Sequence, residues 1–168
     1  DKSISIRSFI IGAISLNVSK VKNVLESEDV FSCIDCLKNF GIKIIKTGTK
    51  KYLIFGKGLG SLKIKKNSSI DFGNSGTLAR LLTGLLSTTP NIQIKIKGDK
   101  SLNKRNMLKL INLLSNFGAS FYPKKKINFP LTLISSEMPI GINYESGVSA
   151  QLKSAAILAG LNAYGVTN

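Results

Sequence analysis

The chain has 168 residues, of which 43% are hydrophobic and 20% charged, a composition typical of a folded protein with a real core. No apolar run approaches the roughly 18 residues that a membrane-spanning helix requires, which excludes an integral membrane protein of that kind. Histidine is absent, so catalysis and metal binding by imidazole are excluded. Two cysteines are too few for a disulfide scaffold and favour a reducing compartment.

The two ends of the chain bear on its location and extent. It opens with Asp1-Lys2 at the start of a helical pattern, without the basic stretch and following apolar stretch of a signal peptide. It stops at Asn168 in the middle of the pattern of predicted elements. We therefore expect a cytoplasmic location and a piece of a longer protein.

The formal net charge of +15 indicates an anionic partner, because the 24 lysine and arginine residues outnumber the nine aspartate and glutamate residues. Nucleic acid, acidic lipid and small phosphorylated metabolites all qualify, and a biased, lysine-rich composition would raise the charge without any partner. Only Arg7, Arg80 and Arg105 are arginines. We expect each to be kept for its bidentate grip on carboxylate or phosphate.

Hydrophobic periodicity and turn residues predict alternating helices and strands. The first part of the chain reads as helix 3–15, strand 19–24, a helix from Ser27 to Gly41, and strands 42–46 and 51–55 joined near Gly48. The remainder reads as strand 62–66, helix 75–87, strand 92–97, helix 104–117, strands 119–122 and 131–134, and helix 149–163.

A loose internal repeat groups these elements. Leu37-Lys-Asn-Phe-Gly41 returns as Leu114-Ser-Asn-Phe-Gly118, which indicates duplicated subdomains. The order of elements predicts an α/β fold, a mixed sheet covered by helices, in repeat units of about 1–60, 61–138 and a third, incomplete one at 139–168.

Two conspicuous motifs favour structural roles. Cys33-x-x-Cys36 lies in a predicted helix and lacks the further soft ligands that zinc requires, so we expect the thiols to pack in a core. The glycine-rich segment 56–61 departs from the phosphate-loop fingerprints, since a strand is predicted after it, and favours a flexible turn.

Four polar segments at predicted helix starts indicate one composite site for an anion. Free N–H groups and the positive end of the helix dipole favour an anion at such positions. The segments carry a hydroxyl, an amide or a glycine beside a cation, and they are Asp1–Arg7, Asp71–Arg80, Ser101–Arg105 and Gly147–Lys153.

These four segments, in this order, resemble the enolpyruvyl transferase family over essentially the whole chain. The matching residues are Asp1-Lys2-Ser3-Ile4-Ser5-x-Arg7, Asp71-Phe-Gly-Asn-Ser-Gly-Thr77-x-x-Arg80, Ser101-Leu102-x-Lys104-Arg105-x-Met107 and Ser149-Ala-Gln151-x-Lys153-Ser-Ala155. Ile6 and Asn106 depart from the family's usual residues, and neither change removes a charged ligand.

The resemblance implies repeated β-α-β-α-β-β units in an inverse α/β barrel, with this chain forming most of an N-terminal domain and the C-terminal domain absent. It implies transfer of an enolpyruvyl group from phosphoenolpyruvate to shikimate 3-phosphate, with phosphate released and without a metal or organic cofactor. The protein would act in the synthesis of aromatic amino acids. The partners are then these small substrates, with no nucleic acid and no membrane, in a full-length monomer.

The resemblance also implies roles for individual residues. Lys2 would contact both substrates and activate them, and Ser3, Arg7 and Ser149 would hold shikimate 3-phosphate. Phosphoenolpyruvate would be held by Gly76 and Arg105, with Gln151 near both substrates. The main acid and base groups are expected outside this chain, which alone should be inactive.

Three alternatives stay open, and one of them is a degenerate homologue that folds but does not turn over. The sibling enzyme that acts on UDP-N-acetylglucosamine usually has a different opening motif and a reactive loop cysteine. A basic, noncatalytic RNA-binding module of related architecture would bind RNA in a salt-dependent way and ignore phosphosugars.

Overall fold

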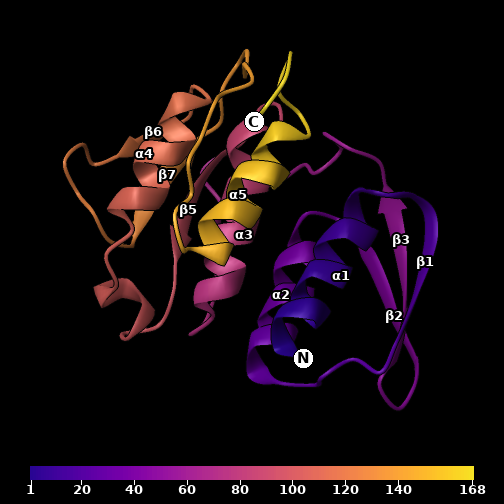
Figure 1. The fold of residues 1–168 in the computed structure, drawn as a ribbon. Coiled ribbons are helices and arrows are strands. Elements are labelled where there is room, and N and C mark those ends of the chain that lie inside the picture. The colour runs from indigo at the N-terminus through magenta and orange to yellow at the C-terminus, as the bar shows by residue number, and fades with distance from the viewer.

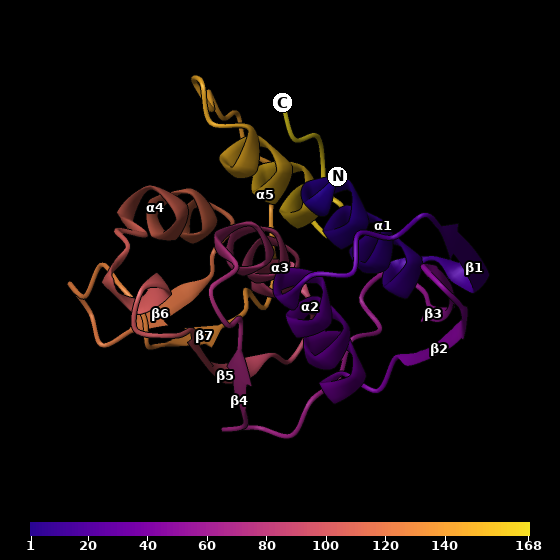
Figure 2. The ribbon, with the colours of Figure 1, turned by 90° about the horizontal axis from the view of Figure 1, so that it is seen from below.

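The computed structural model describes every residue from Asp1 to Asn168. Figure 1 shows two groups of strands accompanied by helices, and in Figure 2 helices α1, α2 and α3 lie between the two sheets. The elements in chain order are α1 (Lys2–Ile14), β1 (Leu16–Lys22), α2 (Glu28–Asn39), β2 (Lys43–Gly48), β3 (Lys51–Lys57), β4 (Ser69–Asp71), α3 (Gly76–Thr88), β5 (Gln93–Lys97), the 3₁₀ helix η1 (Leu102–Lys104), α4 (Leu108–Asn116), β6 (Ser120–Tyr122), β7 (Leu131–Ile134) and α5 (Ala150–Gly160).

The first sheet has the order β1-β3-β2 and is antiparallel throughout. Alternate side chains of β3 point to opposite faces, so Tyr52 and Ile54 are buried toward the helices. The Phe9 ring of α1 meets the Tyr52 ring edge-on at a centroid distance of 5.3 Å. A β-carbon at Gly56 would collide with the carbonyl oxygen of Ser15, so a glycine lets the end of α1 approach the sheet.

The second sheet has the order β4-β5-β7-β6, with β4 and β5 parallel and the other pairs antiparallel. Ile94, Ile96 and Leu133 point into the core, which includes most of α3. Helix α5 packs closely on α3, since a β-carbon at Gly84 would come within 2.7 Å of the carbonyl oxygen of Ala155. One continuous hydrophobic core therefore joins both sheets to the helices.

Most of the expected elements are confirmed, including the α/β class and the turn at the glycine-rich segment, where Gly58 and Gly60 have positive φ. The expectation of mixed sheets holds for the second sheet only, and the chain contains no closed barrel. None of its helices combines the length and apolar character needed to span a membrane.

One predicted strand is wrong, and one predicted helix begins late. Residues 62–66 form no strand, because the parallel partner of β5 is the later segment Ser69–Asp71 and no strand is left to pair with the lysine-rich segment before it. The helix predicted over 104–117 is confirmed as α4, but it begins only at Leu108, after η1 and a backbone bond from the N–H of Met107 to the carbonyl oxygen of Ile127.

Candidate anion-binding site

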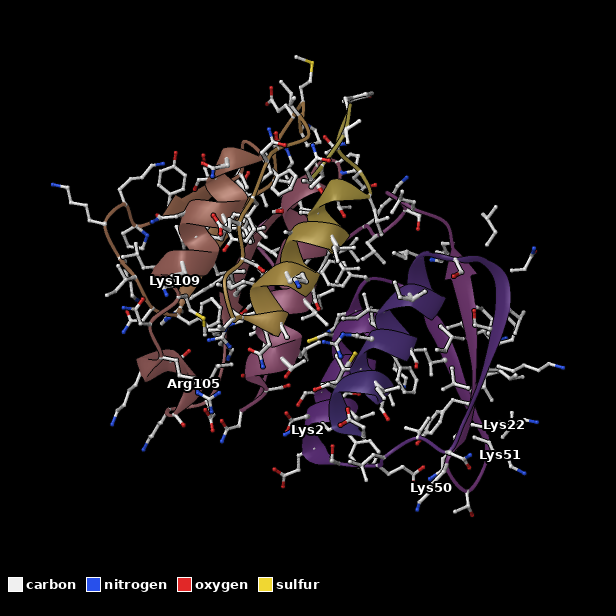
Figure 3. All side chains as sticks on the ribbon, in the orientation of Figure 1. Lys2, Lys22, Lys50, Lys51, Arg105 and Lys109 are labelled. Carbon is white, nitrogen blue, oxygen red and sulfur yellow. The ribbon has the colours of Figure 1, made fainter.

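An open cavity of about 380 Å³ lies where the starts of α1, α2, α3 and α5 approach the end of η1. No hydrophobic side chain lines it; its walls are Lys2, Glu28, Asp29, Asn74, Gly76, Thr77, Arg105 and Gln151. Figure 3 shows Lys2 and Arg105 coming to this region from opposite halves of the chain. The structure thus brings together four of the seven residues predicted for the site: Lys2, Gly76, Arg105 and Gln151.

The α1 side of the cavity carries an ion pair. The ammonium of Lys2 lies 3.2 Å from a carboxylate oxygen of Asp29, which is in the first turn of α2. Asp1 caps α1 by accepting a hydrogen bond from the backbone N–H of Ile4, and this fixes the turn that holds Lys2. The Lys2 side chain remains about half exposed, so its charge is available to the cavity.

The α3 side carries two guanidinium groups. Arg105 donates a hydrogen bond of 3.0 Å to the side-chain oxygen of Asn74, and Arg80 donates one of 2.9 Å to the carbonyl oxygen of Gly76. Ser75 caps α3 and accepts from the N–H of Leu78. Burial and the positive charge of Arg105 lower the pKa of Arg80 from its ordinary value. Two mutually repelling cations at a helix start form a strong attractor for an anion.

Helix α5 contributes an amide. Gln151 donates a hydrogen bond of 3.1 Å to the hydroxyl of Thr77, which links the start of α5 to the start of α3. Ser149 caps α5 by accepting from the backbone N–H of Leu152, and it is not among the residues that line the cavity.

Arg7 and Ser3 are also outside this cavity. Arg7 lines a neighbouring, mainly apolar groove of about 240 Å³ between α1, α3 and α5, where it donates to the hydroxyl of Ser154 at 3.3 Å. Ser3 is half-buried in the first turn of α1 beside Lys2. A ligand that touches both Lys2 and Arg7 would therefore have to extend along α1.

The expectation that Arg105, in the segment Ser101–Arg105, lies at the start of a helix is wrong. Arg7 and Arg80 lie in the first two turns of α1 and α3, but Arg105 follows η1 and precedes α4 in an extended backbone conformation. An extended residue between two helices directs its side chain across to Asn74 instead of along a helix.

Sequence reasoning missed the acidic wall of the cavity. Glu28 and Asp29 lie in the first turn of α2, where acidic side chains are already favourable to the helix dipole and so indicate no site by themselves. Carboxylates are scarce in this chain, and two adjacent ones at a helix start were the available signal. They leave the cavity with both signs of charge, which suits a ligand that carries hydroxyl groups as well as anionic ones.

The two thiols lie away from this cavity. Both are buried in α2, as the sequence predicts, and the Cys36 thiol donates to the carbonyl oxygen of Asp71 at 3.3 Å. Burial raises the pKa of Cys33, and burial with the nearby Asp71 and Asp35 carboxylates raises that of Cys36 to about 12. Neither group is thus poised to be a thiolate.

An α/β fold in which several helix starts surround a polar cavity lined by charges of both signs defines the class of protein, and comparison with known families specifies it. The family model for EPSP synthase (3-phosphoshikimate 1-carboxyvinyltransferase) matches residues 1–168. This chain belongs to that family.

Individual relatives agree. The chain is 41% identical to the 3-phosphoshikimate 1-carboxyvinyltransferase of a Ruegeria species and 42% identical to that of Novosphingobium aromaticivorans, in each case over 99% of its own length. It superposes on EPSP synthase from Acinetobacter baumannii with a TM-score of 0.90 and 35% identity, covering 98% of this chain and 37% of that one. The chain spans 37% and 38% of the length of these two curated relatives.

Proposed function

We propose that this chain forms part of an enzyme that transfers the enolpyruvyl group of phosphoenolpyruvate to shikimate 3-phosphate. The products are 5-enolpyruvylshikimate 3-phosphate and phosphate, and the reaction serves aromatic amino-acid synthesis in the cytoplasm. The observation that carries the proposal is the polar cavity in which Lys2 and Arg105 meet the start of α3. Membership of the family supports the choice of substrates.

The electrostatics of the cavity suit the two substrates, since both carry phosphate and carboxylate groups. In the proposed division of labour, Arg105 and the backbone at Gly76 hold phosphoenolpyruvate at the start of α3. Lys2 lies between the two substrates, and Gln151 approaches both from α5. Ser3, Arg7 and Ser149 hold the phosphate of shikimate 3-phosphate.

The proposed reaction is an addition followed by an elimination. A hydroxyl of shikimate 3-phosphate gives up its proton to a base, and its oxygen bonds to C2 of phosphoenolpyruvate while an acid adds a proton at C3. The adduct then loses a proton from C3 and expels phosphate, which restores the double bond. Lys2 and Arg105 neutralise the anionic groups that must approach each other, and cations fixed in advance favour such a step.

The proposal includes a division into domains. Residues 1–60 and 61–138 would be two complete repeat units and residues 139–168 the start of a third, all in an N-terminal domain. We propose, from the resemblance to the family, that the main proton-transfer groups lie in a C-terminal domain, and the curated relatives are more than twice as long as this chain. We propose that the two domains together enclose the substrates and act without a metal or organic cofactor, in a monomer.

The test is phosphate release by the enzyme that contains this chain, with both substrates present. We expect turnover with shikimate 3-phosphate, none with shikimate, and none with UDP-N-acetylglucosamine as acceptor. Turnover with the nucleotide sugar alone would overturn the proposed acceptor. Failure with every acceptor, in a protein whose circular dichroism shows it folded, would overturn the proposed activity.

A further inference from the structure

The outer face of the first sheet has an unusual composition. Strands β1, β2 and β3 pack on α1 and α2 with one face only, and no other helix or strand makes extensive contact with them. Up to the bulge of β2 after Lys46, every side chain on the other face is either apolar or lysine.

The apolar side chains of this face form a continuous diagonal, here called the apolar band. Val18 lies opposite Phe55, and Leu53 lies opposite Ile45, while Leu16 extends the band along β1. Leu16, Val18 and Ile45 are 76%, 44% and 38% exposed. Strand spacing and rise give the band a length of about 16 Å, which corresponds to about three turns of an α-helix.

Lysines flank the apolar band on both sides. Lys43 and Lys57 lie on one side, and Lys20, Lys22 and Lys51 lie on the other. The ammonium of Lys43 stands 5.0 Å from the centroid of the Phe55 ring, so it projects above the apolar floor. The face therefore presents an apolar floor between two rows of lysines, here called the cationic rims.

The positive charge of the rims has no partner within the chain. Lys22 and Lys51 are directly opposite in the ladder, an arrangement of like charges that destabilises a sheet. The three strands contain no aspartate or glutamate, and none of the chain's salt bridges involves a rim lysine. In Figure 3, Lys22 and Lys51 project from the end of this sheet near Lys50, far from Arg105.

The second sheet provides an internal comparison. The ammonium of its outward-facing Lys97 lies 3.4 Å from a carboxylate oxygen of Asp71. Gln93 and Thr132, on the same face of that sheet, are polar. The band and the unpaired rims thus belong to the first sheet and are not a general property of the repeat.

We propose that the outer face of the first sheet docks an acidic amphipathic α-helix of a partner protein. Such a helix presents an apolar stripe with carboxylates on both sides, which complements an apolar floor between two cationic rims. A bilayer would require apolar side chains that protrude beyond the charges, whereas here Lys43 lies over the ring of Phe55. Single-stranded nucleic acid would require exposed aromatic platforms, and the face has only Phe55, beneath Lys43.

The experiment uses the enzyme that contains this chain and a fluorescent, helical 18-residue peptide with a leucine stripe flanked by glutamates. We expect saturable binding, followed by anisotropy, that weakens as salt is raised. A peptide of the same composition, shuffled to remove the stripe, should bind about tenfold more weakly or worse. Equal binding of the two peptides would show attraction by net charge alone and overturn the proposal.

Two variants locate the binding face. Lys51→Glu should weaken the striped peptide about tenfold, whereas Lys95→Glu, the same charge change on the second sheet, should leave it unaltered. Val18→Thr keeps the shape of the strand and should weaken binding at high salt, where the apolar floor dominates. Equal effects of the two lysine variants on peptide binding would overturn the proposal. It would also be overturned if the peptide did not bind while a single-stranded oligonucleotide or anionic vesicles did, and Lys51→Glu abolished that binding. Phosphate release should be unchanged in all three variants.

Discussion

A guanidinium nitrogen of Arg105 lies 2.6 Å from the position that a β-carbon of residue 76 would occupy, and one of Arg80 lies 2.9 Å from the same position. Two arginines thus converge on the first residue of α3 at a place that only glycine leaves open. The positive charge at the start of α3 depends on this closeness, because a larger residue would push the guanidinium groups away from the helix start.

Replacement of Gly76 by alanine should therefore impair phosphoenolpyruvate binding more than folding. The added methyl group displaces the ends of two flexible side chains, and Arg105 is exposed and free to move. We expect the KM for phosphoenolpyruvate to rise by about 10- to 100-fold, as small displacements at active sites do. Gly48→Ala is the control, since its β-carbon would make only an ordinary contact of 3.8 Å. Unchanged kinetics in the Gly76 variant would contradict the proposed site.

The substitution Arg105→Lys should separate bidentate recognition from charge. Lysine keeps the positive charge but loses the planar fork, at a cost of about 1.5–3 kcal/mol for a charge-assisted contact. We expect kcat/KM for phosphoenolpyruvate to fall by about 10- to 150-fold, with the thermal unfolding midpoint nearly unchanged. Lys104→Arg, one residue earlier, should have no effect on either quantity. Retention of wild-type kinetics by Arg105→Lys would remove Arg105 from the site.

The sequence was sufficient to predict the elements whose signals are local. Helices begin close to their predicted starts after Ser27, Ser75 and Ser149, and Gly41 ends α2 with a φ of +78°, although the Ser27 hydroxyl makes no cap hydrogen bond. The strand expected at 62–66 failed because its alternation of apolar and lysine residues is a local pattern, whereas a strand also needs a neighbour. The break between η1 and α4 likewise depends on a distant group, the carbonyl oxygen of Ile127.

The candidate site was predictable to a similar extent. Cations and glycine at helix starts pointed to Lys2, Gly76 and Arg105, which line one cavity. The pairing of Lys2 with Asp29 was not predictable, because it requires α1 and α2 to lie side by side.

The two thiols should affect stability at alkaline pH and leave catalysis unchanged. Burial raises the pKa of Cys36 from 9.0 to about 12, so above pH 9 the unfolded chain releases a thiol proton that the folded chain keeps. Stability is therefore fully present below pH 9 and falls as pH rises toward 12. We expect urea denaturation to show a shallower loss of stability between pH 9 and 10 in Cys36→Ala than in the wild type.

A double variant that lacks both thiols tests at neutral pH whether they take part in catalysis. Cys33→Ala/Cys36→Ala opens small cavities and should lower the free energy of unfolding by about 1–2 kcal/mol. The folded double variant should keep wild-type phosphate release. Loss of activity without loss of folding would mean that a thiol takes part in the reaction.

Residues 1–168 alone should fold, bind anions weakly and catalyse nothing. The buried core that joins both sheets supplies the stability, although exposed apolar side chains such as Ile157 and Leu161 favour self-association. Lys2 and Arg105 should still attract shikimate 3-phosphate, with an affinity that declines as salt is added. An open cavity does not exclude water and, in the proposed mechanism, lacks the proton-transfer groups. The measurement is phosphate release in the presence of both substrates by the purified chain, alone and mixed with the separately expressed remainder of the enzyme. We expect activity only on mixing. Turnover by the chain alone would contradict the two-domain mechanism.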